Sequence, residues 1–471
     1  MKSIKKIINT YQLVSSTLTQ YSESNLAYIL GNHINNIPAL QRKKKFYGLH
    51  FRVIIFFHFL MSNFSNSQPP KQSFEYFIYA GSKNQYLALE STIQNLDFKK
   101  AIVAFNPRIF KILPLSNCHS IKIGFSPSII LISLGLFLIR FIPQVKTVSK
   151  IHPVAIGNFF NTFCMPYAYL PAFIKLLGQL QPKFVIMSND HSVANRCLLA
   201  AAKQLNISTV YLQHAAVSNI FPPLDFDFSF LDGQSSLDIY MNLYKNLNLS
   251  NNVNKYSVFL SGNKKVLNYS SDCNPQLHVG LALNPLDVES NVTAFLQLLM
   301  TYNFLLNIRL HPSLKISHDL LQFCSKYPSI SIHNAPDIPL TEFLKQCSFL
   351  VASDSSILLE AALSHTPVYY YKLSDTSFKF DYYGFVSSGI CIDLTVNTTE
   401  ILTSIVNDGP VLTSKTALQH HSSSFGTSME GKEGCIVAST LDEISSQQST
   451  FSFFKLKERT FGWCIYDLSV E

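Results

Sequence analysis

The sequence predicts an α/β protein in which two Rossmann-like domains, each with a parallel sheet, face a cleft. Three observations predict this class. Short apolar runs alternate with segments of helical periodicity in two stretches, 71–245 and 276–435. A region rich in Asn, Ser and Lys, 246–275, separates them and is expected to be a linker. Several apolar runs end in polar clusters, and an open parallel sheet presents its ligands at such strand ends.

Residues 1–70 are expected to form a basic and aromatic N-terminal extension. The chain has a net charge of +8, and one basic cluster, Arg42-Lys43-Lys44-Lys45, precedes an apolar run at 51–61. Cations beside aromatic and aliphatic residues suit peripheral contact with an anionic membrane. Nucleic acid is not an expected partner, because the sequence contains no basic stripe and no RNA-binding motif.

The compartment predicted from the sequence is the cytoplasm, and the N-terminal extension suggests peripheral attachment to the inner face of the inner membrane. No apolar core follows Lys2, Lys5 and Lys6, so we expect no signal peptide. The nine Cys show neither CxxC pairs nor zinc spacing, as expected of reduced thiols. The apolar run at 128–143 is short for a membrane span and contains Arg140, so a buried or membrane-surface helix is expected there.

The first domain, 71–245, begins with the predicted strands 74–80 and 101–105. Two later strands, 182–187 and 208–212, flank an amphipathic helix at 193–205. They end in the polar clusters Ser188-Asn189-Asp190-His191-Ser192 and Gln213-His214-Ala215. Both clusters therefore fall at carboxyl ends of neighbouring strands.

These two clusters supply candidates for a catalytic base. A neutral His214 could take the proton of an acceptor hydroxyl, since the pKa of a histidine lies near the working pH. Asp190 and His191 form a second candidate pair, with Asp190 either as the base or as the carboxylate that orients a histidine. The structural alternative is that these side chains are simply hydrogen-bonded at the strand ends.

The second domain, 276–435, follows the same pattern. Its predicted strands are 278–283, 304–310, 330–332, 349–352 and 366–371, with helices near 288–303, 317–326, 340–347 and 357–362. Residues 436–471 are expected to be a C-terminal tail.

Arg309-Leu310-His311-Pro312 ends one of these strands, and Pro312 fixes the direction in which the chain leaves it. A guanidinium at Arg309 and an imidazole at His311 could neutralise a diphosphate or assist a leaving phosphate. The structural alternative is that Arg309 pairs with a carboxylate of the domain.

The strand at 349–352 breaks into the turn Ser353-Asp354-Ser355-Ser356, and a helical segment follows. The unpaired N–H groups of a first helical turn can hold a phosphate, and the hydroxyls of Ser355 and Ser356 add donors. Glu360, one turn further on, could reach a ribose hydroxyl. The structural alternative is an ordinary helix cap that binds nothing.

The stretch DFDFSFLDG contains Asp225, Asp227 and Asp232 and could be taken for an acidic metal motif. No second carboxylate cluster supports octahedral Mg²⁺ ligation, so we expect neither a metal nor a cofactor.

His311-Pro312 followed about forty residues later by Ser355-Ser356 resembles the HP and SS motif pair of bacterial sialyltransferases and polysialyltransferases. The strand end Gln213-His214-Ala215 together with these motifs also resembles the CDP-glycerol glycerophosphotransferases, in which Gly stands where this chain has Ala215. Both groups have the GT-B fold, and the resemblance covers roughly residues 75–435. The sialyltransferase acidic motif has two carboxylates before Gly, whereas this chain has only Leu231-Asp232-Gly233.

The resemblance implies a metal-independent, inverting glycosyltransferase of bacterial surface polysaccharide or glycolipid synthesis. His311 and Ser355-Ser356 would hold a nucleotide-sugar donor, CMP-linked and sialic-acid-like, and His214 or Asp190 would activate a glycan or lipid-linked acceptor. Two enzymatic alternatives remain open, a transferase of CDP-glycerol or another polyol phosphate and an isomerase of the sugar-nucleotide 2-epimerase type. A non-enzymatic scaffold is the third.

Overall fold

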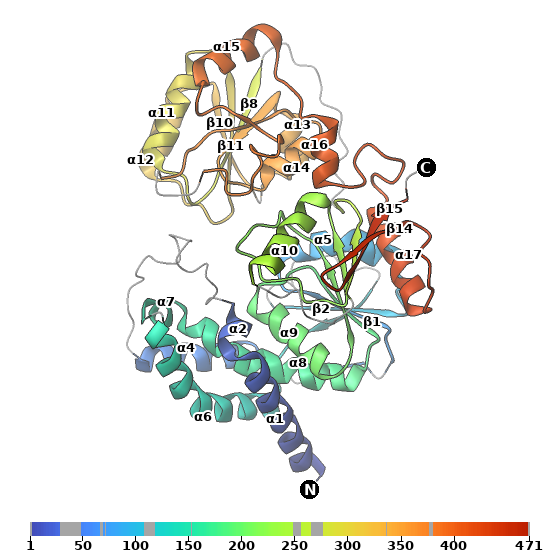
Figure 1. The fold of residues 1–471 in the computed structure, drawn as a ribbon. Helices are drawn as coiled ribbons and strands as arrows, with labels where there is room; N and C mark the ends of the chain where they lie inside the picture. The colour runs from blue at the N-terminus through green and yellow to red at the C-terminus, as the bar shows by residue number, and fades with distance from the viewer. Residues whose placement is uncertain are drawn as a thin grey trace.

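The computed structural model describes residues 2–28, 49–65, 69–70, 72–107, 118–151, 153–247, 256–264, 277–335, 337–375 and 380–469. These residues form two α/β domains on largely parallel sheets, and a group of helices lies against the first domain (Figure 1). The chain passes from the first domain to the second and then returns to the first. The fold class predicted from the sequence is confirmed.

The first domain contains a nine-stranded sheet with the order β14-β15-β7-β6-β5-β4-β1-β2-β3. All neighbours are parallel except β14 and β15, which form an antiparallel pair. The central strands are buried along their whole length, as in sheets covered on both faces. The strands are β1 Tyr76–Ala80, β2 Ala101–Phe105, β3 His119–Lys122, β4 Phe184–Met187, β5 Ser208–Leu212, β6 Phe228–Leu231, β7 Tyr256–Leu260, β14 Phe454–Thr460 and β15 Trp463–Leu468.

Four helices accompany this sheet, namely α5 Lys83–Asn95, α9 Val193–Gln204, α10 Gln234–Asn246 and α17 Glu433–Ser445.

The second domain has a six-stranded parallel sheet with the order β10-β9-β8-β11-β12-β13. Its strands are β8 His278–Leu283, β9 Leu305–Leu310, β10 Ile330–Asn334, β11 Phe349–Ala352, β12 Val368–Tyr370 and β13 Ile392–Asp393. Its helices are α11 Glu289–Met300, α12 His318–Ser325, α13 Leu340–Lys345, α14 Ile357–Leu363, α15 Thr398–Asp408 and α16 Lys415–His421.

Each sheet has one point at which the strand order reverses direction. In the first sheet the reversal lies between β1 and β4, and in the second it lies between β8 and β11. In open α/β sheets the ligand crevice forms outside the carboxyl ends of the strands at such a point. The topology therefore places the turns after β4 and β11 where ligands of this architecture bind.

The domain limits differ from those expected from the sequence. Strand β7 lies inside the range 246–275 that was expected to be a linker, and it pairs with β6 in the first sheet. Strands β14 and β15 lie in the expected tail, 436–471, and β15 pairs with β7. The short apolar run of β7 is flanked by Asn- and Lys-rich sequence, so the average composition of that region hides a core strand.

Residues 1–70 are more than an extension. Their helices α1 Lys2–Tyr21, α2 Glu23–Ala27 and α4 Leu49–Ser62 pack with α6 Pro127–Ile151, α7 Pro153–Cys164 and α8 Pro166–Leu180. Val14, Leu18, Phe56 and Leu60 are buried in the same core cluster as the strands of the first sheet. The basic cluster at 42–45 lies outside the described residues.

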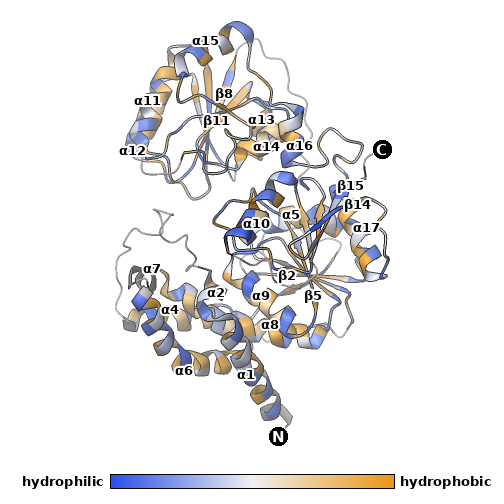
Figure 2. Cartoon of the chain, viewed as in Figure 1, coloured by the Kyte–Doolittle hydropathy of each residue, from blue (hydrophilic) through white to orange (hydrophobic). Residues whose placement is uncertain are grey.

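Within the described chain, one helical stretch, Pro127–Val148 of α6, is long and apolar enough by length and composition to cross a membrane. The helix expected at 128–143 is thus present and longer than expected. Leu136 and Phe141 on its inner side are buried in the domain core, whereas Leu138 and Ile142 project outward. Alternating apolar and polar bands are visible along it in Figure 2.

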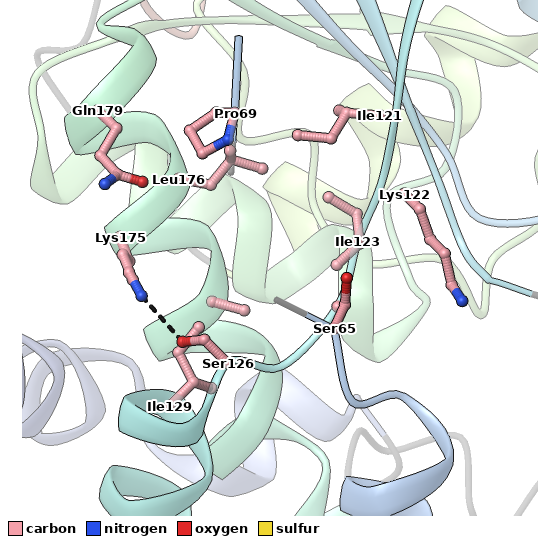
Figure 3. Close-up of a pocket in the computed structure, with 12 residues that line it drawn as sticks. Ser65, Pro69, Ile121, Lys122, Ile123, Ser126, Ile129, Lys175, Leu176 and Gln179 are labelled. Atoms are coloured by element: carbon pink, nitrogen blue, oxygen red, sulfur yellow. Dashed lines mark hydrogen bonds between the residues drawn. The ribbon is translucent and has the colours of Figure 1, made fainter. Parts of the chain in front are cut away.

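The start of α6 lies beside a small pocket at the β3 edge of the sheet (Figure 3). The Lys175 amine from α8 donates hydrogen bonds to the hydroxyls of Ser126 (2.9 Å) and Ser128 (3.2 Å). These bonds fix the beginning of α6 to α8. In the order of the sheet, the pocket lies three strands away from the carboxyl end of β4.

Candidate functional site

The turn after β4 is organised by the side chain of Asn189. Its Oδ1 accepts hydrogen bonds from the backbone N–H groups of His191 (3.1 Å) and Ser192 (2.6 Å), which fixes the orientation of the amide. Its Nδ2 therefore faces the Nε2 atoms of His191 (3.2 Å) and His214 (3.5 Å). Because an amide nitrogen only donates, both Nε2 atoms act as acceptors, and each neutral ring carries its proton on Nδ1.

Asp190 orients His191. The Nδ1 atom of His191 lies 2.8 Å from Asp190 Oδ1, and the hydroxyl of Tyr240 donates to Asp190 Oδ2 at 2.7 Å. The Asp190 side chain is only 1% exposed, whereas that of His191 is 37% exposed. With both carboxylate oxygens engaged and enclosed, Asp190 can orient a base, and the open imidazole of His191 can be one.

Further contacts hold the backbone of this pair in place. Arg196 of α9 donates to the carbonyl oxygens of Asp190 (3.2 Å) and Asn25 (2.6 Å), and its guanidinium lies 5.1 Å from the centre of the Tyr28 ring. The Tyr28 hydroxyl donates to the carbonyl of Ile220. Burial, and then the charge of Asp190, raises the pKa of Tyr28. Neither Arg196 nor Tyr28 was predicted from sequence. Arg196 follows Asp190 by only six residues but belongs to no motif, and Tyr28 lies far from this cluster along the chain.

The loop after β5 reaches the second domain. His214 is partly buried, and its ring centre lies 6.1 Å from that of His191. Two residues on, Ala216 packs against the buried cluster of the second domain. The hydroxyl of Ser218 lies 3.1 Å from that of Tyr382, which belongs to the second domain. The structure therefore brings His191 and His214 together next to an interdomain contact.

On the second domain, the turn after β11 is built around Asp354. Its carboxylate accepts from the backbone N–H of Tyr382 (2.9 Å) and from the hydroxyl of Tyr370 (3.2 Å), and burial raises its pKa. Beside it, Ser353 donates to Asp287, whose pKa burial raises to about 6. Tyr382 thus links the turn after β11 to Ser218 of the first domain.

Ser355 and Ser356 leave their hydroxyls largely uncommitted to the helix start. The Oγ of Ser355 is 3.5 Å from the backbone N of Ile357, at the limit of a hydrogen bond, and Ser356 makes no side-chain cap bond. Both residues and Glu360 are partly exposed. Helix α14 has only seven residues, so the hydroxyls rather than a long helix dipole would be its main offering to a phosphate.

His311 follows β9, and Pro312 begins the turn after it. The backbone N–H of Ser313 donates to Nδ1 of the His311 ring at 3.1 Å, so the neutral ring carries its proton on Nε2. Partial burial lowers the pKa of His311, which favours this neutral form. His311 is thus an exposed hydrogen-bond donor at a strand end.

Arg309 has a different role from the predicted one. Its guanidinium donates to the carbonyl oxygens of Ile338 (2.6 Å) and Ala335 (3.2 Å) and lies 5.4 Å from the centre of the Phe343 ring. Arg309 therefore holds the segment after β10, a role that neither the phosphate-binding prediction nor the carboxylate-pairing alternative anticipated.

The three aspartates of DFDFSFLDG serve separate structural contacts. Asp225 pairs with Lys203, Asp227 accepts from the backbone N–H (2.8 Å) and hydroxyl (2.7 Å) of Thr209, and Asp232 faces the buried amine of Lys264 at 3.6 Å. Among the residues that the structure describes, no group of three or more His, Cys, Asp or Glu is placed to hold a metal ion.

Solved structures share this architecture at low sequence identity. A protein from Listeria monocytogenes described as a UDP-N-acetylglucosamine 2-epimerase superposes with a TM-score of 0.50 and 9% identity, over 80% of this chain and 98% of that one. MurG from Acinetobacter baumannii gives a TM-score of 0.41 and 14% identity, over 75% and 95% of the two chains. No protein-family model and no curated protein sequence matches the chain. The chain has the GT-B fold, as the motif resemblance implied.

Proposed function

We propose that the chain is an inverting, metal-independent glycosyltransferase that transfers a sugar from a nucleotide donor to a glycan or lipid-linked acceptor. One observation carries the proposal. Tyr382 bonds both the turn after β11 and the loop after β5, and so joins the two strand-end clusters at which a GT-B protein would hold its donor and its acceptor. The structural neighbours include glycosyltransferases and a UDP-GlcNAc 2-epimerase bound to UDP-GlcNAc, which supports a nucleotide sugar as the ligand class.

On the acceptor side, His191 is the proposed base and Asp190 the residue that positions it. The acceptor oxygen forms a bond to the anomeric carbon while the bond from that carbon to the donor phosphate breaks. The acceptor hydroxyl takes the place of the Asn189 amide at Nε2 of His191 and its proton moves to that atom, while the buried carboxylate of Asp190 stabilises the imidazolium through Nδ1–H. His214, which shares the Asn189 amide with His191, is the second histidine in reach of the acceptor.

On the donor side, the Nε2–H of His311 and the hydroxyls of Ser355 and Ser356 are the proposed contacts of the phosphate. The neutral imidazole of His311 donates a hydrogen bond that stabilises the charge developing on the leaving phosphate oxygen. Glu360, on the first turn of α14, is the proposed contact of the ribose. Arg309 is left out of this set because its guanidinium donates to the backbone carbonyls of Ile338 and Ala335 and so holds the segment after β10.

The proposed donor is a CMP-linked, sialic-acid-like sugar, and the proposed setting is bacterial surface glycan synthesis at the cytoplasmic face of the inner membrane. The HP and SS motifs support this choice of donor. They serve a CDP-linked glycerol or polyol equally well, which is the alternative transfer reaction. An epimerase of the UDP-GlcNAc type is the other alternative, and its support is the fold likeness to the Listeria protein.

Thermal unfolding with CMP, CDP, UDP and GDP, each with and without EDTA, tests the donor class, since a ligand that binds only the native state raises the Tm. A rise with CMP or CDP that EDTA leaves unchanged supports the proposal. A rise with UDP alone, with epimer formed from UDP-GlcNAc in the absence of acceptor, replaces it with the epimerase. No rise with any nucleotide overturns both.

A further inference from the structure

Helix α6 carries a stripe of exposed aliphatic side chains on the side away from the domain core. Leu131, Leu138, Ile139 and Ile142 are exposed by 62%, 73%, 62% and 62%. Positions 131, 138 and 142 are separated by seven and four residues, so they share one side of the helix. Single exposed aliphatic residues are common on proteins, but a continuous stripe of this kind marks an interaction surface.

Helix α4 also carries a stripe of exposed apolar side chains. The two helices are in contact, because the rings of Phe56 on α4 and Phe137 on α6 stack with their centres 5.2 Å apart. On α4, Ile54, Phe57 and Met61 follow the spacing i, i+3, i+7 and are exposed by 59%, 50% and 47%. We call these three residues and the four of α6 the α4/α6 apolar surface. The two helices belong to the helical group at the lower left of Figure 2.

The charge of the surrounding sequence has one sign. The whole chain contains 29 Asp and Glu, yet ranges 24–74 and 98–189, which supply both helices, contain none. The range 98–189 contains ten Lys and Arg, among them the exposed Lys146 and Lys150 near the end of α6. Glu23, the only acidic residue before Glu75, is buried and paired with Arg140 at 2.6 Å. The apolar surface is therefore set in cationic sequence, which complements anionic lipid head groups.

Helix α6 is attached to its own domain along its length, which argues against a transmembrane orientation. At its start Ser126 and Ser128 accept hydrogen bonds from Lys175, in its middle Arg140 pairs with Glu23, and one turn later Gln144 accepts from the hydroxyl of Tyr167 at 2.8 Å. A membrane-spanning α6 would break these bonds and strip its inner side from the core. The same helix can lie parallel to a bilayer without any such change.

We infer that the α4/α6 apolar surface docks on an anionic lipid bilayer, with α6 lying in the interface and its exposed stripe among the acyl chains. The inference does not depend on the transferase reaction, since vesicle binding is measured without donor or acceptor. It gives the proposed membrane contact a defined surface and an orientation.

The test is co-sedimentation of the full chain with vesicles of phosphatidylcholine alone or of phosphatidylcholine with phosphatidylglycerol. We expect binding to the anionic vesicles, weakening as salt is raised. The triple variant Leu138→Ser, Ile139→Ser, Ile142→Ser should lower the vesicle-bound fraction by at least about tenfold, because the stripe supplies the apolar contact. The matched control is a second triple variant in which Val396, Val411 and Leu412 of the second domain are replaced by Ser. These residues are exposed by 77%, 58% and 57%, and this variant should bind the vesicles as the parent does.

Three outcomes would overturn the inference. Equal vesicle binding by the triple variant and the parent would place the contact elsewhere. A parent chain that is dimeric by light scattering, fails to bind vesicles and becomes monomeric in the triple variant would make the surface an interface between two copies. A chain that sodium carbonate does not release from anionic vesicles or cell membranes would be inserted rather than docked. Circular dichroism of each variant verifies folding, and a failure of nucleotide binding leaves these readings unchanged.

Discussion

The turns after β4 and β11 are built alike and do different things. Each follows a buried four-residue strand at the point where its sheet reverses order. Each encloses an aspartate that accepts from a tyrosine hydroxyl, Tyr240 to Asp190 and Tyr370 to Asp354. The other carboxylate oxygen differs, since Asp190 holds an imidazole and Asp354 holds the backbone of Tyr382. The same local pattern thus prepares a reactive side chain in one domain and positions an interdomain contact in the other.

The largest effect is expected from His191→Ala, which removes the imidazole that Asp190 orients. Loss of a general base lowers kcat by about 100- to 10,000-fold. The dissociation constant of the donor should stay unchanged, because His191 belongs to the acceptor side. Steady-state rates and calorimetric donor binding measure the two quantities. His318→Ala, at an exposed histidine of α12, is the matched control, and parental turnover in His191→Ala would remove the base from this turn.

Replacing each aspartate by asparagine separates the two roles directly. Asp190→Asn removes the charge that stabilises the imidazolium and should lower kcat by roughly 10- to 1,000-fold with little change in donor affinity. Asp354→Asn should instead weaken the hydrogen bonds that hold Tyr382 at the interdomain contact. The free energy of unfolding should fall by about 1–2 kcal/mol, because this buried hydrogen-bond network is weakened. Urea unfolding and kinetics of both variants give the comparison. Equal kinetic losses in the two variants would mean that the turns do not differ in role.

His421 shows what enclosing a histidine does in the absence of a carboxylate partner. Its ring lies between the hydroxyls of Ser235 (3.1 Å) and Ser388 (2.9 Å), and burial, with a smaller effect of His420, lowers its pKa to about 4. Between about pH 6.5 and pH 4 the histidine is therefore protonated in the unfolded chain but neutral in the folded chain. The free energy of unfolding consequently falls as the pH falls through this window. At pH 5 the loss should be about 2 kcal/mol. Urea unfolding at pH 7 and pH 5 measures it, and His421→Gln should abolish this part of the pH dependence.

His311→Ala tests the donor side. It removes one hydrogen bond to a charged group, so the affinity for the donor nucleotide should weaken by about tenfold. Because its pKa is lowered and the neutral ring is the donor, parental affinity should be constant from pH 7 upward. Calorimetry of parent and variant against CMP or CDP measures both. His365→Ala in the same domain is the control, and unchanged affinity in His311→Ala would move the phosphate elsewhere.

The smallest effect is expected at the contact between Ser218 and Tyr382. Either Ser218→Ala or Tyr382→Phe should cost about 1 kcal/mol, the net value of one hydrogen bond. The double variant should cost no more than one single variant, because both remove the same bond. Additive losses in urea unfolding would mean that the two hydroxyls act independently.

The sequence predicted the parallel strands and the strand-end clusters because both depend on local pattern. Buried strands are short apolar runs, and a polar turn at the end of such a run is visible without a structure. The candidates His191, His214, His311 and Ser355 consequently lie at carboxyl ends of strands, as expected. The sequence left two roles open for Asp190, a base or the carboxylate that orients a histidine, and the structure pairs it with His191.

What the sequence did not reveal depends on distant segments. Tyr28 and Tyr382 reach the site from distant parts of the chain, and Arg196, although only six residues after Asp190, belongs to no motif that marks its contacts. Arg309 has a side chain long enough to reach either the cleft or the carbonyls after β10, so its position on the strand left its role open. Strand β7 escaped notice because its short apolar run is flanked by Asn- and Lys-rich sequence, and one of its two partners, β15, lies some two hundred residues further on.

The pairing of β15 with β7 also bears on how the protein is made. During translation β1 to β7 emerge from the ribosome well before residues 463–468 are synthesised, and the whole second domain is translated in between. During that time β7 is an exposed sheet edge with unpaired backbone groups, and such edges invite association with other chains. The pairing of β15 with β7 that covers this edge joins residues about two hundred positions apart, and such contacts form slowly. Expression yield should therefore respond to chaperones during synthesis more than to the stability of the finished protein.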